Sequence, residues 1–343
     1  MRVLHVLASN RYSGAENVVC QIIEMFQGEV DMAYCSPDGP IQKSLDEKGI
    51  QFFPLSKLNA KELKKVIAKY NPDVIHAHDF KASILSSKFS KKARVVSTIH
   101  GNKKGMDKLS LKSVIFNIFS KKLDMIIWVS KSCFNDYYFK SKVEDKSITL
   151  HNILSIDNLN KKALADKSNE KYDVVFLGRL VVEKNPLRLV EIAKEVTLKQ
   201  PNFKMCIIGD GEYREQMQSL VNHYGLTENV IFKGFLRNPH VILNNSKVML
   251  MTSIMEGTPM CSLEALGLGV PMVSTKVDGL VEIIEEGYNG YLYDTNEEAV
   301  NHILTLISDN ELLEKISNNC KEWSKTYNDI SKYTEKLINI YNN

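Results

Sequence analysis

Short apolar stretches alternate with longer amphipathic stretches along almost the whole chain. The short stretches are rich in β-branched residues and are bounded by turn-forming residues, which is typical of buried strands. In the first half they predict strands at Val3–Ala8, Asp31–Cys35, Gln51–Pro54, Val74–His76, Arg94–Thr98, Met125–Val129 and Ile148–Leu150. In the second half they predict strands at Tyr172–Leu177, Lys204–Ile208, Val230–Phe232, Val248–Thr252, Met272–Ser274 and Gly290–Tyr293. Strands that alternate with helices form βαβ units, so the pattern predicts an α/β fold with doubly wound parallel sheets.

A polar stretch rich in Asn, Lys and Asp separates the two series of strands. The chain has 343 residues, which exceeds the usual size of a single core. We therefore expect a Rossmann-like domain at 1–155, a linker at 156–171, a second Rossmann-like domain at 172–325, and a C-terminal helix at 326–343 that crosses back onto the first domain. Ligands of such domains bind in a cleft at the carboxyl ends of the strands.

The composition is that of a soluble globular protein, with 44% apolar and 25% charged residues. The longest apolar runs are far shorter than the ~20 residues that cross a bilayer, and the chain opens on a strand pattern instead of a signal peptide. A cytoplasmic protein is expected.

The six cysteines form no C-x-x-C pair, and no histidine group has metal-ligand spacing, so neither a disulfide framework nor a metal site is expected.

The charge is divided unevenly between the two halves. Residues 1–150 carry 24 Lys and Arg against 15 Asp and Glu, a net charge of +9, whereas the remainder carries −6. A basic first half and an acidic second half indicate that the two halves meet different partners.

Two acids, Glu256 and Glu264, lie on either side of Thr258-Pro259, which predicts the start of a helix with Thr as the cap and Pro at the first helical position. Glu256 then precedes the helix. Glu264 lies among apolar residues inside it, where a carboxylate needs donors such as vicinal sugar hydroxyls. The N–H groups of Met260 and Cys261 would face an anion such as phosphate. The alternative is a loop acid and a structural salt bridge.

Arg179 and Lys184 follow the strand Tyr172–Leu177, in the strand-to-helix loop where α/β domains bind phosphate. The alternative is a pair of solvated surface cations. A second glycine-rich turn, which contains Gly209, follows the next strand and also opens a helix.

In the first half, Gly14 opens a helix after the first strand and would let the backbone approach a diphosphate. The absence of G-x-G-x-x-G argues against a dinucleotide cofactor. His76 and His78 follow one strand and are expected to be structural, whereas His100, at a strand end beside Gly101, is better placed to reach a ligand.

These motifs occur together and in one order: Ser13-Gly14-Ala15-Glu16, His100-Gly101, Gly178-Arg179-Leu180 with Glu183-Lys184, Ile207-Ile208-Gly209-Asp210-Gly211, and Glu256 with Glu264. Over nearly the whole chain they resemble the retaining GT-B glycosyltransferases of family 4. The resemblance implies two Rossmann-like domains that face a cleft. One departure is Ser13, which stands where the family usually has a glycine.

The resemblance implies transfer of a hexose or N-acetylhexosamine, with retention and without a metal or other cofactor, from a nucleotide diphosphate sugar to a glycan or lipid-linked acceptor. A UDP-sugar donor is expected from its frequency in the family, and the product would be a cell-surface polysaccharide or glycolipid. Carried over by motif, the site residues are Arg179 and Lys184 for the diphosphate, Glu256 for donor-sugar hydroxyls, Glu264 for the ribose, His100 for the donor sugar or reaction centre, and Gly14, Gly209, Met260 and Cys261 for donor binding. The leaving phosphate oxygen would help to deprotonate the acceptor, so no separate base is needed.

Two alternatives remain. A GT-B-fold epimerase would change the nucleotide sugar without an acceptor, and a catalytically silent subunit would bind the donor without turnover. The complete set of Arg179, Lys184, Glu256 and Glu264 argues against the silent subunit.

Residues Lys103–Lys122 place lysines on either side of the apolar residues Leu111, Ile115, Ile118 and Phe119. This pattern favours a helix that lies on an anionic membrane surface. The alternative is an ordinary helix packed on the sheet. With the +9 charge of the first half, we expect peripheral contact with the inner face of the cell membrane and no nucleic-acid partner.

Overall fold

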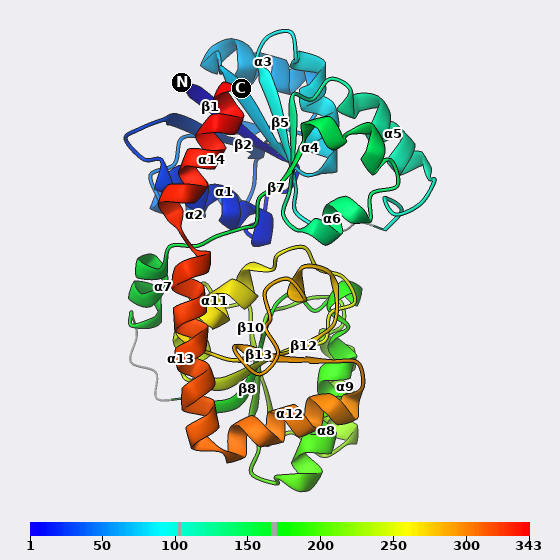
Figure 1. The fold of residues 1–343 in the computed structure, drawn as a ribbon, viewed down its shortest axis with the longest axis vertical. Coiled ribbons are helices and arrows are strands. Elements are labelled where there is room, and N and C mark those ends of the chain that lie inside the picture. Colours follow the sequence, from blue (N-terminus) through cyan, green and yellow to red (C-terminus); the bar gives the residue numbers. More distant parts are fainter. Residues whose placement is uncertain (102–103, 166–169) are drawn as a thin grey trace. The chain divides into compact units, whose positions relative to one another are not determined.

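The computed structural model describes residues 1–101, 104–165 and 170–343. The chain folds into two compact units, drawn in Figure 1. The first contains Met1–Ile153 together with Asp329–Asn343, and the second contains Leu154–Asn328. Residues 154–155 and 326–328 therefore belong to the second unit, and not to the first domain and the crossing helix in which they were expected.

The first unit is built on a seven-stranded parallel sheet. Its strands are β1 (Arg2–Leu7), β2 (Asp31–Pro37), β3 (Phe52–Leu55), β4 (Val74–His78), β5 (Arg94–Ile99), β6 (Met125–Trp128) and β7 (Ser147–Thr149). They lie in the order β3-β2-β1-β4-β5-β6-β7. Because the order reverses direction beside β1, the carboxyl ends of β1 and β4 lie at the switch point, where ligands of such sheets bind.

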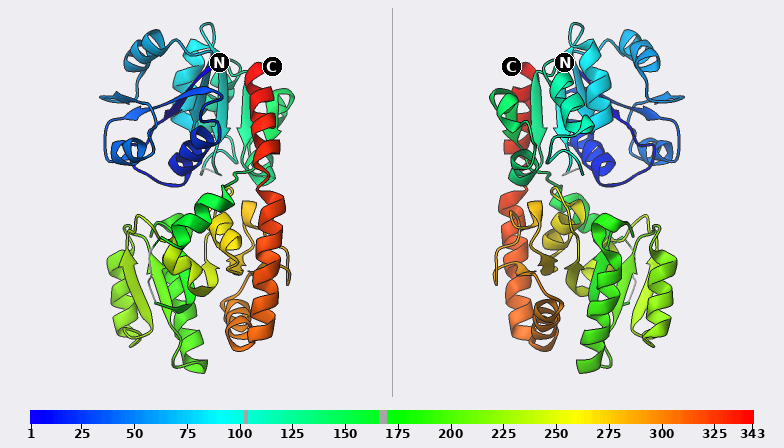
Figure 2. Two further views of the ribbon diagram at one scale, coloured as in Figure 1. Left: turned by 90° about the vertical axis from the view of Figure 1, so that its left-hand side faces the viewer. Right: turned by 90° about the vertical axis from the view of Figure 1, so that its right-hand side faces the viewer.

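Helices cover both faces of this sheet (Figure 2). They are α1 (Gly14–Met25), α2 (Ile41–Glu47), α3 (Ala60–Tyr70), α4 (Phe80–Ser86), α5 (Leu111–Ser120), α6 (Lys131–Asn135) and α14 (Ile330–Asn342). Successive side chains of a strand point to opposite faces of the sheet. On one face, an apolar core contains Leu4, Val6, Ile75 and Ala77 together with Leu63 and Ile67 of α3. The opposite face carries His5 and His76 and is contacted by α14, since Tyr341 bonds to His76.

The second unit is built on a six-stranded parallel sheet. Its strands are β8 (Tyr172–Leu177), β9 (Met205–Ile208), β10 (Val230–Gly234), β11 (Ser246–Met251), β12 (Met272–Thr275) and β13 (Gly290–Tyr293), in the order β10-β9-β8-β11-β12-β13. Its helices are α7 (Ile156–Ala163), α8 (Pro186–Lys199), α9 (Arg214–His223), α10 (His240–Asn244), α11 (Met260–Leu268), α12 (Asn296–Ser308) and α13 (Asn310–Tyr327). Every expected strand is present, and the predicted α/β class with two doubly wound parallel sheets is confirmed.

The polar stretch 156–171, expected to be a linker, begins with the helix α7. Leu159 and Ala163 of this helix are buried. The helix α7 packs on α10 and α11 and is part of the second unit. The helix forms because Ser155 caps it and because its apolar residues Ile156, Leu159 and Ala163 are three and four residues apart. Residues 166–169 of the expected linker lie outside the described residues.

All six cysteines are free thiols, and five of them are buried. Each helix in the described part of the chain is too short or too polar to cross a bilayer.

Candidate active site

Two loops meet at the carboxyl ends of β8 and β11, which are neighbours in the second sheet. The loop after β8 runs from Gly178 to Asn185, and the loop after β11 begins at Thr252. The Thr252 hydroxyl donates to the carbonyl oxygens of Lys184 and Asn185, at 2.8 and 3.0 Å. The Ile254 N–H donates to the Glu183 carbonyl at 2.9 Å. These bonds hold the two loops in fixed positions, so the side chains that they carry have defined neighbours.

The central contact of the site joins Lys184 and Glu256. The Lys184 Nζ donates to Glu256 Oε1, and the Ser253 hydroxyl donates to the same oxygen at 2.6 Å. The two charged side chains are only 15% and 9% exposed. Burial alone would lower the pKa of the Lys184 ammonium, but the Glu256 charge and hydrogen bond outweigh it and raise that pKa above its usual value. A buried, charged lysine is thus held in place at the carboxyl ends of two strands.

Further contacts hold Glu256 from the side of β12. The Glu256 N–H donates to Asp278 Oδ2 at 2.7 Å, and the Thr275 hydroxyl donates to the Ser253 carbonyl at 2.6 Å. Asp278 has a φ of +39°, a left-handed conformation that is uncommon outside glycine. Ser253 and Asp278 did not emerge from the sequence, although each follows the carboxyl end of a strand.

The helix α11 begins beside this pair. Its N-cap is Pro259, not Thr258, so the expected threonine cap and the expected proline at the first helical position are both wrong by one residue. Pro259 adopts an extended conformation that the N-cap requires, and Met260 starts the helix. Burial raises the pKa of the Cys261 thiol to about 11, although the nearby Lys184 acts in the opposite direction. Cys261 is therefore a neutral thiol next to the ion pair, and its backbone N–H belongs to the first helical turn.

Glu264 lies one turn further along α11 and is 12% exposed. Its Oε1 is 3.5 Å from Nε2 of His240, the first residue of α10. His240 is buried and its Nδ1 bonds to the Asn238 side chain at 2.8 Å. Nothing in the local pattern singled out His240, because the two residues are brought together only by the packing of α10 on α11.

The glycine-rich turn after β9 packs directly against the loop after β8. Gly209 has a φ of +134°, and a Cβ at this position would lie 1.8 Å from the Gly178 carbonyl oxygen. The Gly209 N–H donates to the Gly234 carbonyl at 2.8 Å. Gly209 therefore allows two backbones to touch. Arg179, in the neighbouring loop, is exposed, and its charge acts on Lys184.

The other two predicted residues belong to the first unit. His100 follows β5 and is partly buried, with Nε2 3.0 Å from His78 Nδ1. Gly14 is the first residue of α1, and a Cβ there would meet no atom within 4 Å. Of the predicted residues, the structure thus brings Lys184 and Glu256 into direct contact, with Cys261 close by, and pairs Glu264 with His240.

Two units that are each built on a doubly wound parallel sheet form the GT-B fold of glycosyltransferases. Comparison with known families agrees: the model of Glycosyltransferase Family 4 matches residues 12–154, and that of Glycosyl transferases group 1 matches residues 157–323. The chain belongs to these glycosyltransferases.

Three comparisons illustrate the relationship. The chain is 25% identical to the Escherichia coli UDP-Gal:alpha-D-GlcNAc-diphosphoundecaprenol alpha-1,3-galactosyltransferase, over 99% of this chain and 96% of the relative. It is 27% identical to the alpha-monoglucosyldiacylglycerol synthase of Acholeplasma laidlawii, over 79% of this chain and 75% of the relative. Its fold matches that of Anabaena HepE in complex with UDP, with a TM-score of 0.84 and 19% identity, over 99% of both chains.

Proposed function

We propose that the protein transfers a hexose or N-acetylhexosamine from a UDP-sugar to a glycan or lipid-linked acceptor, with retention of the anomeric configuration and without a metal. The observation that carries this proposal is the buried pair of Lys184 and Glu256 at the N-terminus of α11. It places a fixed cation and a carboxylate beside the first N–H groups of α11, and a sugar diphosphate needs groups of these kinds.

The charges of the site match the charge that develops in the reaction. When the bond between the sugar and the diphosphate breaks, negative charge grows on the leaving oxygen, and Lys184, Arg179 and the first N–H groups of α11 stabilise it. In this role they replace a divalent cation. Glu256 Oε1 already accepts bonds from Lys184 and Ser253. The second carboxylate oxygen of Glu256 is therefore the acceptor for donor-sugar hydroxyls. Glu264 accepts from the ribose hydroxyls, and the leaving phosphate oxygen takes the proton of the acceptor.

A donor screen tests the first part of the proposal. Thermal shift of the full chain is measured with UDP-, GDP- and ADP-sugars, and hydrolysis of the stabilising donor is then followed with and without EDTA. We expect stabilisation by a UDP-sugar and hydrolysis that EDTA does not slow. Stabilisation by none of the donors would overturn the proposal. Binding without turnover would favour the silent subunit, and an epimerised nucleotide sugar formed without an acceptor would favour the epimerase.

The stereochemistry is tested on the first product formed with an acceptor. Proton NMR of the new glycosidic linkage is expected to show the anomeric configuration of the donor. An inverted product would exclude the retaining mechanism while leaving the assignment of the donor intact.

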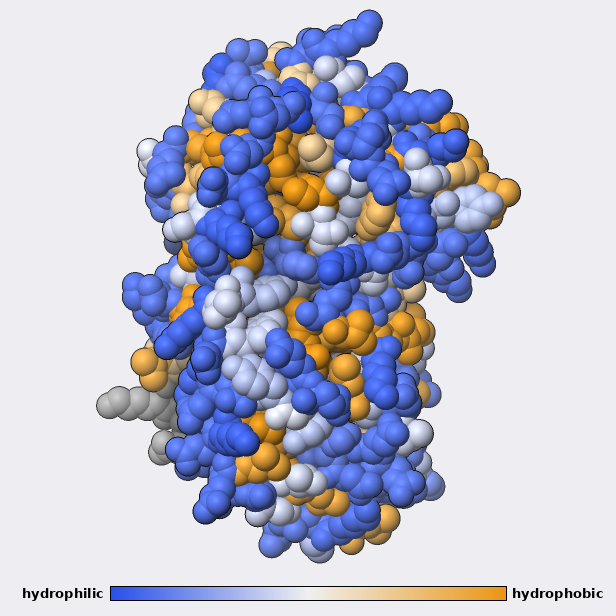
Figure 3. Space-filling model, in the orientation of Figure 1, coloured by the Kyte–Doolittle hydropathy of each residue, from blue (hydrophilic) through white to orange (hydrophobic). Residues whose placement is uncertain are grey.

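A surface on α5 supports a lipid-linked acceptor at the inner face of the cell membrane. Ser113, Phe116 and Ser120 face the core, whereas Leu111 and Ile118 are 78% and 55% exposed. Ile115 and Phe119 are partly exposed. Figure 3 shows hydrophobic side chains on the outer side of the region that contains α5, next to hydrophilic ones. Exposed lysines at 104, 108, 121 and 122 flank this surface, and Lys103 lies outside the described residues. An apolar patch with cationic edges is complementary to an anionic lipid surface.

Sedimentation with vesicles of phosphatidylglycerol tests this surface. Leu111→Glu is expected to lower the bound fraction at least several-fold, because it places a negative charge on the membrane-facing side. The matched control is Leu198→Glu on α8, where the leucine is equally exposed at 77%. Equal binding of both variants, or no binding of the unaltered protein at low salt, would exclude the membrane contact.

A further inference from the structure

Two aspartates that follow strands have a backbone conformation that is uncommon outside glycine. Asp79 comes directly after β4 in the first unit and has a φ of +107°, and Asp278 lies in the loop after β12 in the second unit and has a φ of +39°. A residue with a side chain is strained at positive φ and is held there only where surrounding contacts stabilise it. Such residues gather at functional sites, so the contacts of these two side chains indicate what the strain serves.

Both aspartates accept a hydrogen bond from the backbone of the loop after the neighbouring strand. The Ala8 N–H, directly after β1, donates to Asp79 Oδ2 at 2.9 Å. The Glu256 N–H, in the loop after β11, donates to Asp278 Oδ2 at 2.7 Å. In each sheet the two strands are neighbours, with β1 beside β4 and β11 beside β12. Each carboxylate therefore fixes the loop of one strand at the carboxyl end of the next strand.

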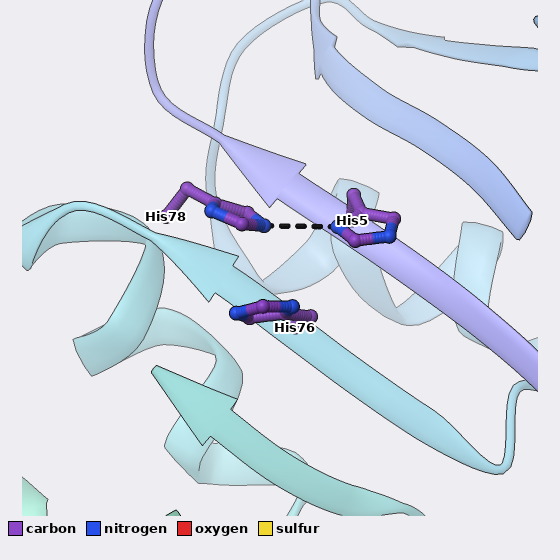
Figure 4. Close-up of side chains that lie close together, drawn as sticks. All are labelled: His5, His76 and His78. Atoms are coloured by element: carbon purple, nitrogen blue, oxygen red, sulfur yellow. Dashed lines mark hydrogen bonds between the residues drawn. The ribbon is translucent and has the colours of Figure 1, made fainter. Parts of the chain in front are cut away.

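The bond to Asp79 lies next to buried histidines. Asp79 follows His78, and Figure 4 shows the rings of His5, His76 and His78 turned toward one another. Ring nitrogens of these three residues lie within 4.8 Å of one another, a grouping that could hold a metal ion and that sequence spacing did not show. His5 Nδ1 is 2.9 Å from His78 Nε2, and both nitrogens of His76 lie 2.7 Å from hydroxyl groups. A metal ion held by all three rings would have to replace some of these bonds. Asp79 thus belongs to a hydrogen-bonded framework inside the first unit.

Asp278 differs because the residue that it holds is Glu256, the carboxylate of the candidate active site. Glu256 Oε1 accepts from Lys184 and, at 2.6 Å, from the Ser253 hydroxyl. One oxygen of the Glu256 side chain is fixed by these donors, and the Glu256 peptide N–H is fixed by Asp278. The Glu256 side chain is only 9% exposed, so little water is available to replace either contact. With the peptide and one oxygen held, the second oxygen of Glu256 has a defined position.

We propose that Asp278 is a positioning residue for sugar transfer, whose carboxylate holds the Glu256 peptide so that the second carboxylate oxygen of Glu256 meets the hydroxyls of the donor sugar. Glycine would adopt the left-handed backbone without strain but could not accept the Glu256 N–H. The bond therefore explains a strained aspartate at this position. This inference rests on the proposed function, in which Glu256 binds the donor sugar.

Amide hydrogen exchange, followed by NMR of the full chain, tests the bond. In Asp278→Gly the Glu256 N–H is expected to exchange at least about 10-fold faster than in the unaltered protein, because its acceptor is lost. Asp278→Asn keeps an acceptor oxygen and tolerates the left-handed backbone, so its exchange rate should stay close to that of the unaltered protein. Equal exchange of this N–H in all three proteins would overturn the proposal.

Rates of donor hydrolysis test the positioning. Asp278→Gly should lower kcat about 10- to 100-fold while the Kd of UDP stays unchanged, since Glu256 is assigned to the sugar and not to the nucleotide. Asp278→Asn should keep most of the rate. Asn71→Gly is the matched control and should keep the full rate, because Asn71 has a similar φ of +48° but ends α3 in the first unit. Equal losses of kcat in Asp278→Gly and Asp278→Asn would overturn the proposal.

A double variant separates positioning from a general effect on the fold. In Glu256→Gln the carboxylate is already lost, so adding Asp278→Gly should lower kcat little further if Asp278 acts through Glu256. A second loss as large as the loss in Asp278→Gly alone would reduce Asp278 to a structural role. If the unaltered protein turned over no donor, the proposed function would fail, whereas the amide exchange would still decide whether Asp278 holds Glu256.

Discussion

For single residues, burial distinguishes ion pairs in which each partner needs the other from ion pairs in which each charge is also solvated by water. Lys184 and Glu256 are both largely buried, so neither can be replaced without leaving the other in a poorly solvated position. Lys276 and Asp294 form a pair with a similarly short contact, but their side chains are 45% and 63% exposed. Ion pairs of this kind on the surface contribute little to the stability of the fold.

Lys184→Ala is expected to lower kcat about 100-fold, because a preorganised charge at the leaving group is lost. Glu256→Gln should lower it as well, and the double variant should lose less than the sum of the two effects, because the residues act as one unit. Steady-state hydrolysis of the donor measures these rates, and Lys276→Ala serves as the control. Strictly additive losses would show that the pair is not coupled in the reaction.

Gly209→Ala is expected to prevent folding or to lower the free energy of unfolding by more than ~3 kcal/mol, since its Cβ would meet the Gly178 carbonyl. Gly225→Ala is a matched control, because Gly225 also has a positive φ of +67° but has open space around it. Gly225→Ala should lower the free energy of unfolding by about 1 kcal/mol. Urea unfolding compares the two, and equal costs would contradict the backbone contact described for Gly209.

At the scale of elements, the C-terminal helix α14 illustrates how a distant segment completes a sheet face. The Arg94 Nε donates to the Ile340 carbonyl at 2.9 Å, and the Tyr341 hydroxyl bonds to His76. Both contacts lie on the face of β4 and β5 that carries the histidines. The helix therefore covers the buried rings and contributes one of their hydrogen-bond partners.

Tyr341→Phe is expected to lower the free energy of unfolding by about 1 to 3 kcal/mol, because it leaves Nδ1 of the buried His76 without its partner. The control is Tyr333→Phe on the same helix, whose hydroxyl makes no hydrogen bond within the described part of the chain. Chemical denaturation followed by circular dichroism measures both. If the Tyr341→Phe protein were as stable as the control, the hydrogen bond to His76 would make no contribution to the free energy of unfolding.

At the scale of the whole molecule, the buried histidines link stability to pH. In the unfolded chain each histidine takes up a proton as the pH falls below about 6.5, whereas burial lowers the pKa of folded His5 to about 3. Stability from this group is therefore complete above pH 6.5 and is lost as the pH falls toward 3. His76 and His78 act in the same direction because their pKa values are lowered too.

Between pH 7 and pH 5 we expect His5 alone to reduce the free energy of unfolding by about 2 kcal/mol, at ~1.4 kcal/mol per pH unit below 6.5. Urea titrations at both pH values measure the loss. In His5→Gln the loss should be smaller by about that amount. The same pH dependence in both proteins would contradict a neutral, buried His5.

From the apolar and polar pattern we could predict the strands, the parallel α/β class, and the places of Arg179, Lys184 and Glu256 after strand ends. This was possible because burial and periodicity are local properties that a stretch of chain displays without reference to its neighbours. Which side chains touch depends on how the elements pack in three dimensions. Strand order puts β1 beside β4, and their register puts His5 opposite His76, which lies 71 residues away along the chain. The packing of α10 on α11 and of α14 on the first sheet likewise selected His240 as the neighbour of Glu264 and Tyr341 as that of His76. Such pairs depend on which elements become adjacent, and no local pattern of apolar and polar residues encodes that adjacency.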